Sequence, residues 1–385
     1  MNDQEIAGWV GRRPLRHRAY PYTGGVSAGT ISFARGVPAP ECLPVSDLAD
    51  CAKTAIEHDG AAALLYGHTL GYEPLREWIG EHHGVDPSRV VVTNGSLQAF
   101  HFVLSTFAAG RRVIVERPTY DRPRKILAAM PGGFDEVAID EHGLDVDELE
   151  GLPGGPRFLY TIPTFQNPAG VTLSGERRGR LVALALDGDL RILEDDPYGL
   201  VRYDGDPSPT LFELEGGKKV LYSSSFSKTI APGLRVGYAI VPDEHAGGLE
   251  DLVASTYISP ALVAQATVLE FLRRGLFEPN LERVRDLLRA RRDAMLGALE
   301  RELDGRARWS RPEGGYFLWL ELPESLDAGE LLSRATETGV TFVPGIDFGG
   351  PPNSARLAFS FASPAEIEEG VKRLAKLVAA TPAAV

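Results

Sequence analysis

The chain has 385 residues, a length that exceeds one ordinary domain and suggests two that pack closely. Hydrophobic residues make up 43% and charged residues 24%, so the chain can bury a large core and still be soluble. The formal net charge of −13, with no long basic run, argues against nucleic acid or an anionic membrane surface as a partner.

The N-terminal segment and the cysteines indicate where the protein resides. Residues 1–20 are polar and rich in arginine, with no apolar signal core, and no run in the chain reaches the length of a membrane span. Cys42 and Cys51 lack C-x-x-C spacing, and no histidine pattern completes a metal site. We therefore expect a cytoplasmic protein with two reduced thiols, no metal and no membrane association.

From about Val45 onward, short apolar runs alternate with longer amphipathic stretches. Such runs predict strands that are buried on both faces of a mostly parallel sheet, and they cover residues 89–93, 112–116, 158–161, 190–194 and 219–222. Helical patterns lie between them, for example at residues 96–109 and 174–186. This alternation predicts an α/β fold with crossover helices.

The pattern changes near residues 277–280. A long charged helix is predicted over residues 281–303, followed by two helices and by strands at residues 316–320, 340–343 and 356–359. Residues 380–385 are predicted to form a loose tail. We therefore expect a large domain over residues 36–280, a small α+β domain over residues 281–385, and an N-terminal arm over residues 1–35 that belongs with the small domain.

Lys228 differs from the other lysines of the chain. Lysine is scarce, with seven residues among the 40 lysines and arginines, and Lys228 follows the predicted strand 219–222 within Ser-Ser-Phe-Ser-Lys-Thr. Ligands of open α/β sheets bind at the carboxyl ends of strands, and the hydroxyls together with Arg235 can hold a phosphate. Partial burial and a nearby positive charge lower the pKa of a lysine and free its amine to attack a carbonyl. The alternative is a surface lysine on a serine-rich loop.

Polar groups follow three other predicted strands. Of the three acids at residues 194–196, one could pair with a cationic ring nitrogen. The amide of Asn167 is held in a loop with two prolines, where it could bond a ligand oxygen. Ser96 begins a helix after a glycine, and free backbone N–H groups there favour phosphate. Each segment also has an alternative interpretation without a ligand. Residues 194–196 could form an ordinary acidic turn, the Asn167 segment a plain loop, and Ser96 an ordinary helix start.

Together these segments resemble the class I aminotransferases of pyridoxal 5'-phosphate (PLP) fold type I, in particular the subgroup of 2-aminoadipate, kynurenine and aromatic aminotransferases. The resemblance covers nearly the whole chain and implies a large domain with a mostly parallel mixed sheet flanked by helices, plus a small α+β domain. The motifs occur in the family's order, and they are Gly36 to Glu41, Tyr66-Gly67, Gly95-Ser96-Leu97-Gln98, Glu116 to Tyr120, the Asn167 loop, Asp195 to Tyr198, Ser225 to Lys228, Arg235-Val236-Gly237, Gly314-Gly315 and Arg356-Leu357.

The resemblance also implies roles. Lys228 would carry PLP as a Schiff base and later move the substrate's α-proton. Asp195 would pair with the pyridinium nitrogen, so that the ring acts as an electron sink. Tyr120 would stack on the ring, while Asn167 and Tyr198 would bond its 3'-oxygen.

The remaining roles concern the phosphate and the substrate. Phosphate would be held at the Gly95 helix start by Ser96, the backbone at Leu97, Ser225, Ser227 and Arg235. Tyr66 would reach the phosphate of a second subunit, which implies a homodimer with shared active sites. Arg356 would clamp the substrate's α-carboxylate with a bidentate pair, with Asn167 and Tyr316 beside it.

Several positions depart from the family's pattern. The family often has glycine where Ser224 stands, usually tyrosine in place of Leu288, and glutamine in place of Leu97. It has methionine in place of Tyr316 and asparagine in place of Ala358. The last two lie near the carboxylate clamp in the family, so they affect the choice of substrate.

The function implied is a PLP-dependent aminotransferase that moves an amino group between an L-amino acid and a 2-oxo acid. The alternative on the same scaffold is elimination, replacement, decarboxylation or carbon–carbon bond formation. A regulator's effector domain is less favoured, because the match begins near Ser32, and no G-x-G-x-x-G follows an early strand as a dehydrogenase needs. The arginines in the first 20 residues could accept a second substrate carboxylate or form a solvated arm, and these are Arg12, Arg13, Arg16 and Arg18.

Overall fold

The computed structural model describes residues 29–188, 190–242 and 246–380. Residues Ile31–Val385 form one compact unit, and the architecture below is that of this unit. The arginines of the N-terminal arm and residues 381–385 lie outside the described residues.

An eight-stranded sheet forms the centre of the larger part of this unit. Its order is β2-β9-β8-β7-β6-β3-β4-β5, and β3, β4, β6, β7 and β8 pair in parallel. β9 runs antiparallel to both of its neighbours, and β5 runs antiparallel to β4. The strands are β2 (Val90–Thr93), β3 (Arg112–Arg117), β4 (Asp135–Asp140), β5 (Gly143–Leu144), β6 (Arg157–Thr161), β7 (Leu190–Asp195), β8 (Val220–Ser225) and β9 (Gly237–Ile240).

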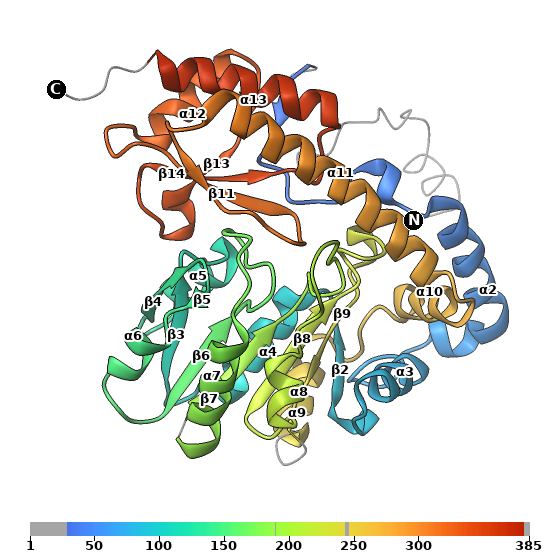
Figure 1. The fold of residues 1–385 in the computed structure, drawn as a ribbon. Helices are drawn as coiled ribbons and strands as arrows, with labels where there is room; N and C mark the ends of the chain where they lie inside the picture. The colour runs from blue at the N-terminus through green and yellow to red at the C-terminus, as the bar shows by residue number, and fades with distance from the viewer. Residues whose placement is uncertain (1–28, 189, 243–245, 381–385) are drawn as a thin grey trace, which may run out of the picture. The chain divides into compact units, whose positions relative to one another are not determined.

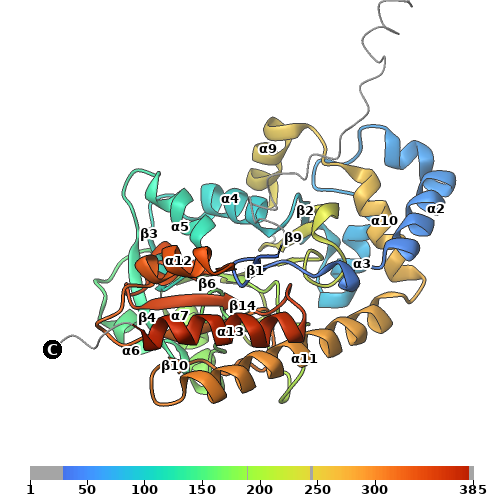
Figure 2. The same ribbon diagram turned by 90° about the horizontal axis from the view of Figure 1, so that it is seen from above.

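Helices cover both faces of this sheet, as crossover connections require. Figure 2 shows α4 (Ser96–Phe107) and α9 (Ala246–Tyr257) on one side of the strands and α7 (Gly175–Asp187) on the other. The sheet helices also include α5 (Asp121–Ala128), α6 (Val146–Gly151) and α8 (Leu211–Glu215). All residues of β2, β8 and β9 are buried, and the predicted apolar runs at residues 89–93 and 219–222 correspond to β2 and β8. The predicted α/β class with a mostly parallel sheet is confirmed.

A second, smaller sheet lies beyond α11. Its order is β10-β11-β14-β13, and its pairs are antiparallel. The elements are β10 (Arg308–Trp309), β11 (Phe317–Glu321), β13 (Val343–Pro344) and β14 (Ser354–Ala358). Figure 1 shows α12 (Ala328–Glu337) and α13 (Pro364–Ala379) packed over this sheet, next to the long helix α11 (Phe277–Leu303).

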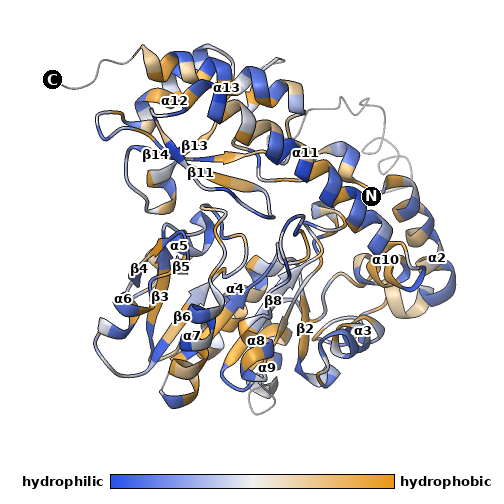
Figure 3. Ribbon diagram, viewed as in Figure 1, coloured by the Kyte–Doolittle hydropathy of each residue, from blue (hydrophilic) through white to orange (hydrophobic). Residues whose placement is uncertain are grey.

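The remaining helices pack beside the large sheet. They are α2 (Val45–Leu64), α3 (Glu73–His83) and α10 (Leu262–Arg273), with α2 lying against α10 (Figure 1). Figure 3 shows hydrophobic residues gathered on α8 and β2, whereas α11 alternates between hydrophilic and hydrophobic positions. In the part of the chain that the structure describes, no single helix is long and apolar enough to cross a membrane. Helices Gly248–Tyr257 and Leu262–Arg273 meet that test only as a pair bent by 118°.

Three predicted elements differ from the structure by more than a shift of one or two residues at an end. The strand predicted to end at Tyr222 continues to Ser225, because β8 pairs with β9 up to Gly237. The long helix begins at Phe277 rather than at residue 281, since a proline in the first helical turn needs no hydrogen bond from its nitrogen.

The predicted strand at residues 340–343 is two strands. β12 (Val340–Thr341) pairs in parallel with β1 (Ile31–Ser32), whereas β13 pairs with β14. The chain changes partners at Phe342, and an apolar run carries no signal for such a change.

Candidate active site

Lys228 lies in the turn that follows β8, at the carboxyl end of the sheet. Its Nζ donates a 2.7 Å hydrogen bond to the carbonyl oxygen of Gly36 and lies 5.0 Å from the centroid of the Tyr316 ring. Burial lowers the pKa of Lys228 to about 7, and the positive charges of Arg356 and Arg235 act in the same direction. A large share of the amine is therefore neutral at pH 7 and able to attack a carbonyl.

Two of the three acids that end β7 have structural partners. Glu194 accepts hydrogen bonds from the first two backbone N–H groups of α8, at 3.1 and 2.9 Å. Asp196 accepts one from the backbone N–H of Gly199 at 2.8 Å and one from the Tyr222 hydroxyl at 3.1 Å. These carboxylates hold the local fold, because each of them caps or braces a neighbouring segment.

Asp195 differs from both of its neighbours. Its Oδ2 accepts a 2.8 Å hydrogen bond from the Tyr160 hydroxyl, but its buried Oδ1 has no partner among the described residues. Burial raises the pKa of Asp195 to about 7, and the negative charges of Asp196 and Glu116 add to the rise. A buried acceptor without a donor is costly, so this position suits a cationic N–H group supplied by a ligand.

The N-terminus of α4 lies at the same end of the sheet. Gly95 is its N-cap residue with φ 84°, and no side chain caps the helix. Gly237 on β9 passes so close that a Cβ there would lie 2.6 Å from the backbone nitrogen of Ser96. Leu97 packs partly against the core, so the predicted phosphate-binding turn presents its backbone. Exposed first-turn N–H groups favour an anion.

Hydroxyls and a guanidinium group lie beside this turn. The Ser225 hydroxyl donates to Ser227 Oγ at 2.8 Å. Arg235, which adopts a left-handed φ of 53°, donates to the carbonyl oxygen of Asn94 at 2.9 Å and to Ser227 Oγ at 3.5 Å. Its guanidinium lies against Gly95, where a Cβ would force the arginine side chain to move. Positive charge, hydroxyls and backbone N–H groups therefore converge at one place.

Arg356, on β14 of the small sheet, reaches the same region. Its Nη1 donates to Asn167 Oδ1 at 3.0 Å, and its Nη2 donates to the carbonyl oxygen of Ala34 at 3.0 Å. The guanidinium lies 4.3 Å from the ring centroid of Phe317 and 4.7 Å from that of Phe348. Within the described residues its buried Nε has no partner. The two rings fix the plane of the guanidinium group, and this fixed plane suits bidentate binding of a carboxylate.

A buried network supports the loop that carries Asn167. Glu116 accepts hydrogen bonds from the Thr161 hydroxyl at 2.5 Å and from Gln166 Nε2 at 2.9 Å. Gln166 Nε2 also donates to the carbonyl oxygen of Pro118 at 2.8 Å. Burial raises the pKa of Glu116 to about 7, although these hydrogen bonds oppose the rise. Glu116 and Gln166 were not predicted as supporting residues, because their only signal in the sequence is a place inside the matched motifs.

The predicted tyrosines occupy different places. Tyr120 directly precedes α5, and the buried ring of Tyr198 has its centroid 5.7 Å from Lys228 Nζ. The Tyr316 hydroxyl donates to the Lys228 carbonyl oxygen at 2.9 Å. Tyr66 does not join them: it is 83% exposed, and no hydrogen bond within the described residues links it to the other predicted site residues.

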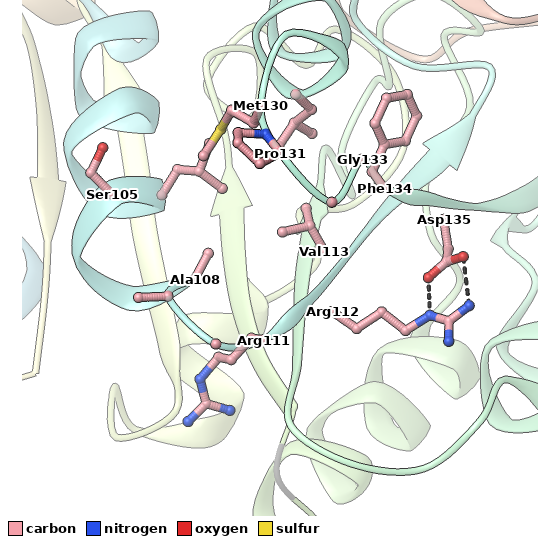
Figure 4. Close-up of a pocket in the computed structure, with 15 residues that line it drawn as sticks. Ser105, Ala108, Arg111, Arg112, Val113, Met130, Pro131, Gly133, Phe134 and Asp135 are labelled. Atoms are coloured by element: carbon pink, nitrogen blue, oxygen red, sulfur yellow. Dashed lines mark hydrogen bonds and ion pairs between the residues drawn. The ribbon is translucent and has the colours of Figure 1, made fainter.

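A surface pocket of about 590 Å³ lies at the opposite end of β3, between α4 and the segment that leads into β4 (Figure 4). Arg112 and Asp135 in its wall bind each other, as the dashed lines in Figure 4 show. None of the predicted site residues lines this pocket. The predicted residues Lys228 and Asp195 lie instead at the carboxyl end of the large sheet, and Arg356 lies on β14 of the small sheet.

Comparison with known proteins identifies the family. The family model described as aminotransferase class I and II matches residues 41–374. The chain belongs to this family. This aminotransferase is 39% identical to a 2-aminoadipate transaminase of Thermus thermophilus, over 90% of each chain. It is 36% identical to aromatic-amino-acid aminotransferase 1 of Thermococcus litoralis, over 91% of this chain and 88% of the other.

The solved structures agree with the sequence relatives. The α-aminoadipate aminotransferase of Thermus thermophilus, complexed with N-(5'-phosphopyridoxyl)-L-leucine, superposes with a TM-score of 0.86 and covers 98% of both chains at 36% identity. The fold is PLP fold type I, PLP is the cofactor, and the protein is an amino-group transferase, as predicted. Elimination, replacement and bond formation are not favoured.

The residues of this chain fit that cofactor. Asp195 Oδ1 is a buried acceptor that lacks a donor among the described residues, and a pyridinium N–H would supply one. The close approach of Gly237 to the start of α4 leaves backbone N–H groups for the phosphate.

Proposed function

We propose that the predicted residues perform the amino transfer as a single site, with Lys228 as the group that carries PLP and moves the substrate's α-proton. Bound PLP supplies an electron sink for the negative charge that develops at the α-carbon. The observation that carries the proposal is the buried Oδ1 of Asp195, unpaired within the described residues, together with the low-pKa amine of Lys228. A cation beside Asp195 would keep this carboxylate ionised, although burial alone raises its pKa to about 7.

The proposed phosphate contacts are supported by where the predicted residues lie. Ser96, the Leu97 backbone, Ser225, Ser227 and Arg235 would hold the phosphate at the start of α4, since charge-assisted hydrogen bonds from these groups suit three acceptor oxygens.

Aromatic and amide groups would orient the ring. Tyr120 and Tyr198 come from the carboxyl ends of β3 and β7, and the Tyr198 ring lies 5.7 Å from Lys228 Nζ. Asn167 is held by Arg356 at 3.0 Å, so its amide has a fixed orientation. We propose that Tyr120 covers one face of the ring and that Asn167 and Tyr198 bond the ring oxygen.

We propose an L-amino acid and a 2-oxo acid as substrates, both held through the α-carboxylate by Arg356. Burial lowers the pKa of Arg356 to about 10, so the guanidinium remains charged at pH 7. Tyr316 precedes Phe317, whose ring lies under this guanidinium, so Tyr316 would limit the space beside the clamp. The names of the relatives make L-2-aminoadipate and the aromatic amino acids the first donors to test.

The test of the clamp is Arg356→Lys. A lysine cannot copy the planar fork, so we expect KM for the amino donor to rise at least tenfold, about 1.4 kcal/mol, while the free-enzyme spectrum stays unchanged. Arg202→Lys is the matched control, because Arg202 also stacks on a phenylalanine, 4.6 Å from the Phe165 centroid, and lies outside the proposed site. An unchanged KM in Arg356→Lys would exclude the clamp.

We also propose a homodimer with shared sites. Leu64, Leu65 and Tyr66 are 64%, 70% and 83% exposed, and Ile258 is 62% exposed. Thr69 Oγ1 donates to the Ile258 carbonyl oxygen at 3.1 Å, so these apolar residues belong to one neighbourhood. An exposed apolar patch of this kind suits a second copy of the chain.

We propose a cytoplasmic location from the sequence features given above. Immunodetection of the tagged protein in fractionated cells tests this, and recovery in the membrane or secreted fraction would contradict it.

A further inference from the structure

Tyr316 contacts Lys228 in two ways. Its hydroxyl donates a 2.9 Å hydrogen bond to the backbone carbonyl oxygen of Lys228, and its ring centroid lies 5.0 Å from Lys228 Nζ. Within the described residues, no other hydrogen bond reaches that carbonyl oxygen. Tyr316 is 1% exposed, so water does not replace this donor easily.

The backbone around Tyr316 is fixed from several sides. The backbone N–H of Gly315 donates to the Val201 carbonyl oxygen at 2.9 Å, and that of Phe359 donates to the Tyr316 carbonyl oxygen at 3.1 Å. The Tyr203 hydroxyl donates to the Gly315 carbonyl oxygen at 3.2 Å. Tyr316 therefore presents its hydroxyl and ring from a rigid support.

The ring adds an electrostatic contribution. The Tyr316 and Tyr198 rings lie 5.0 and 5.7 Å from Lys228 Nζ, within the range in which an aromatic face attracts an ammonium group. When the amine takes a proton from the substrate's α-carbon, the bonding electron pair stays on the carbon and the nitrogen becomes positive. The two rings stabilise the nitrogen in that charged state.

We propose that Tyr316 is a positioning residue for proton transfer: its hydroxyl fixes the backbone of Lys228, and its ring faces the amine. This goes beyond a role in substrate choice, because the hydroxyl is bound to the Lys228 backbone. It also couples the small sheet to the cofactor lysine, since Tyr316 directly precedes β11, which pairs with the strand of Arg356. The inference rests on the proposed role of Lys228.

The test compares Tyr316→Phe, Tyr316→Met and Tyr203→Phe in the holoenzyme. Tyr203→Phe is the matched control, because it removes a buried tyrosine hydrogen bond one residue away that does not touch Lys228. Single turnovers use α-deuterated L-tyrosine or L-2-aminoadipate, whichever reacts faster. A titration of the visible absorbance of the holoenzyme reports the pKa of the Lys228 nitrogen without any substrate.

We expect Tyr316→Phe to slow the proton-transfer step about tenfold, with a larger deuterium isotope effect and KM within about twofold, because the backbone of Lys228 loses its tether. Tyr316→Met should in addition lower the pKa of the Lys228 nitrogen by roughly half a unit to one unit, because the ring is lost. Tyr203→Phe should stay within about twofold of the parent rate and leave the pKa unchanged, because Gly315 keeps its backbone hydrogen bond to Val201.

Two outcomes overturn the proposal: Tyr316→Phe matching the parent, or Tyr316→Phe and Tyr203→Phe slowing the step equally. A Lys228→Ala arm separates this inference from the proposed function. If Lys228→Ala still transfers the proton, the role of Lys228 is wrong; if it does not and Tyr316→Phe is normal, only the role of Tyr316 is wrong.

Discussion

Two neighbouring carboxylates, Asp195 and Asp196, show how much of the chemistry depends on what a side chain contacts. Both are buried acids that follow one strand, and the sequence could not tell which would serve a cofactor. The structure gives Asp196 two hydrogen bonds, from Gly199 and Tyr222, and within the described residues leaves Asp195 with one free oxygen. Tyr160 of β6 and Tyr222 of β8 supply two of the contacts that distinguish the acids, so the local sequence alone does not predict the difference.

The pair gives a prediction with its own control. Asp195→Asn should still bind PLP but lose several orders of magnitude in kcat, about 1.4 kcal/mol of barrier for each factor of ten, because a neutral ring is a poor electron sink. Asp196→Asn should instead lower the melting temperature and keep most of the activity, since Asp196 braces the fold. Steady-state kinetics and thermal melts of both variants measure this. If Asp196→Asn lost the activity and Asp195→Asn lost only stability, Asp196 would be the cofactor's partner.

At the scale of elements, the sequence predicted the strands that are buried on both faces and the helices between them. These strands leave short apolar runs, as at β2 and β6. β9 was missed because it is a short segment whose first residue, Gly237, is the last residue of the Arg235-Val236-Gly237 motif. The split at Phe342 was missed because strand partners far apart in the sequence decide it.

The junction of β9 and α4 also carries a prediction. A Cβ on Gly237 would lie 2.6 Å from both the Gly95 carbonyl carbon and the Ser96 nitrogen, so Gly237→Ala must displace the start of the helix. We expect the dissociation constant for PLP to rise at least tenfold, about 1.4 kcal/mol. Fluorescence titration of the apoprotein measures it, and Gly233→Ala, where a Cβ meets open space, is the control. Equal PLP affinity in both variants would contradict the phosphate-binding role of this turn.

For the whole molecule, the candidate site draws residues from distant parts of the chain. Asp195 ends a strand of the large sheet, Lys228 follows another, and Arg356 comes from the small sheet. The carbonyl oxygens of Gly36 and Ala34 accept hydrogen bonds from Lys228 and Arg356. The roles of Lys228, Asp195 and Arg356 could be predicted, because their motifs occur in the order typical of a known family. The two backbone carbonyl groups were not predictable, because a carbonyl oxygen has no signature in the sequence.

The shared-site proposal can be tested by complementation. Tyr66→Phe and Lys228→Ala homodimers should each have low activity. After mixing and subunit exchange, heterodimers would contain one site with both residues intact, so activity should recover to a substantial fraction of the parent value. Analytical ultracentrifugation confirms the assembly, and mixing two Lys228→Ala preparations is the control. An active protein that is strictly monomeric would contradict shared sites.

The central claim, that Lys228 carries the cofactor, is tested most directly by borohydride reduction of the purified holoenzyme followed by peptide mass spectrometry. Reduction converts the bond between PLP and its lysine into a stable secondary amine. We expect the phosphopyridoxyl mass on the peptide that contains Lys228 and on none of the peptides with the other six lysines. The label on a different lysine, or no label on protein that is active and contains PLP, would contradict the account.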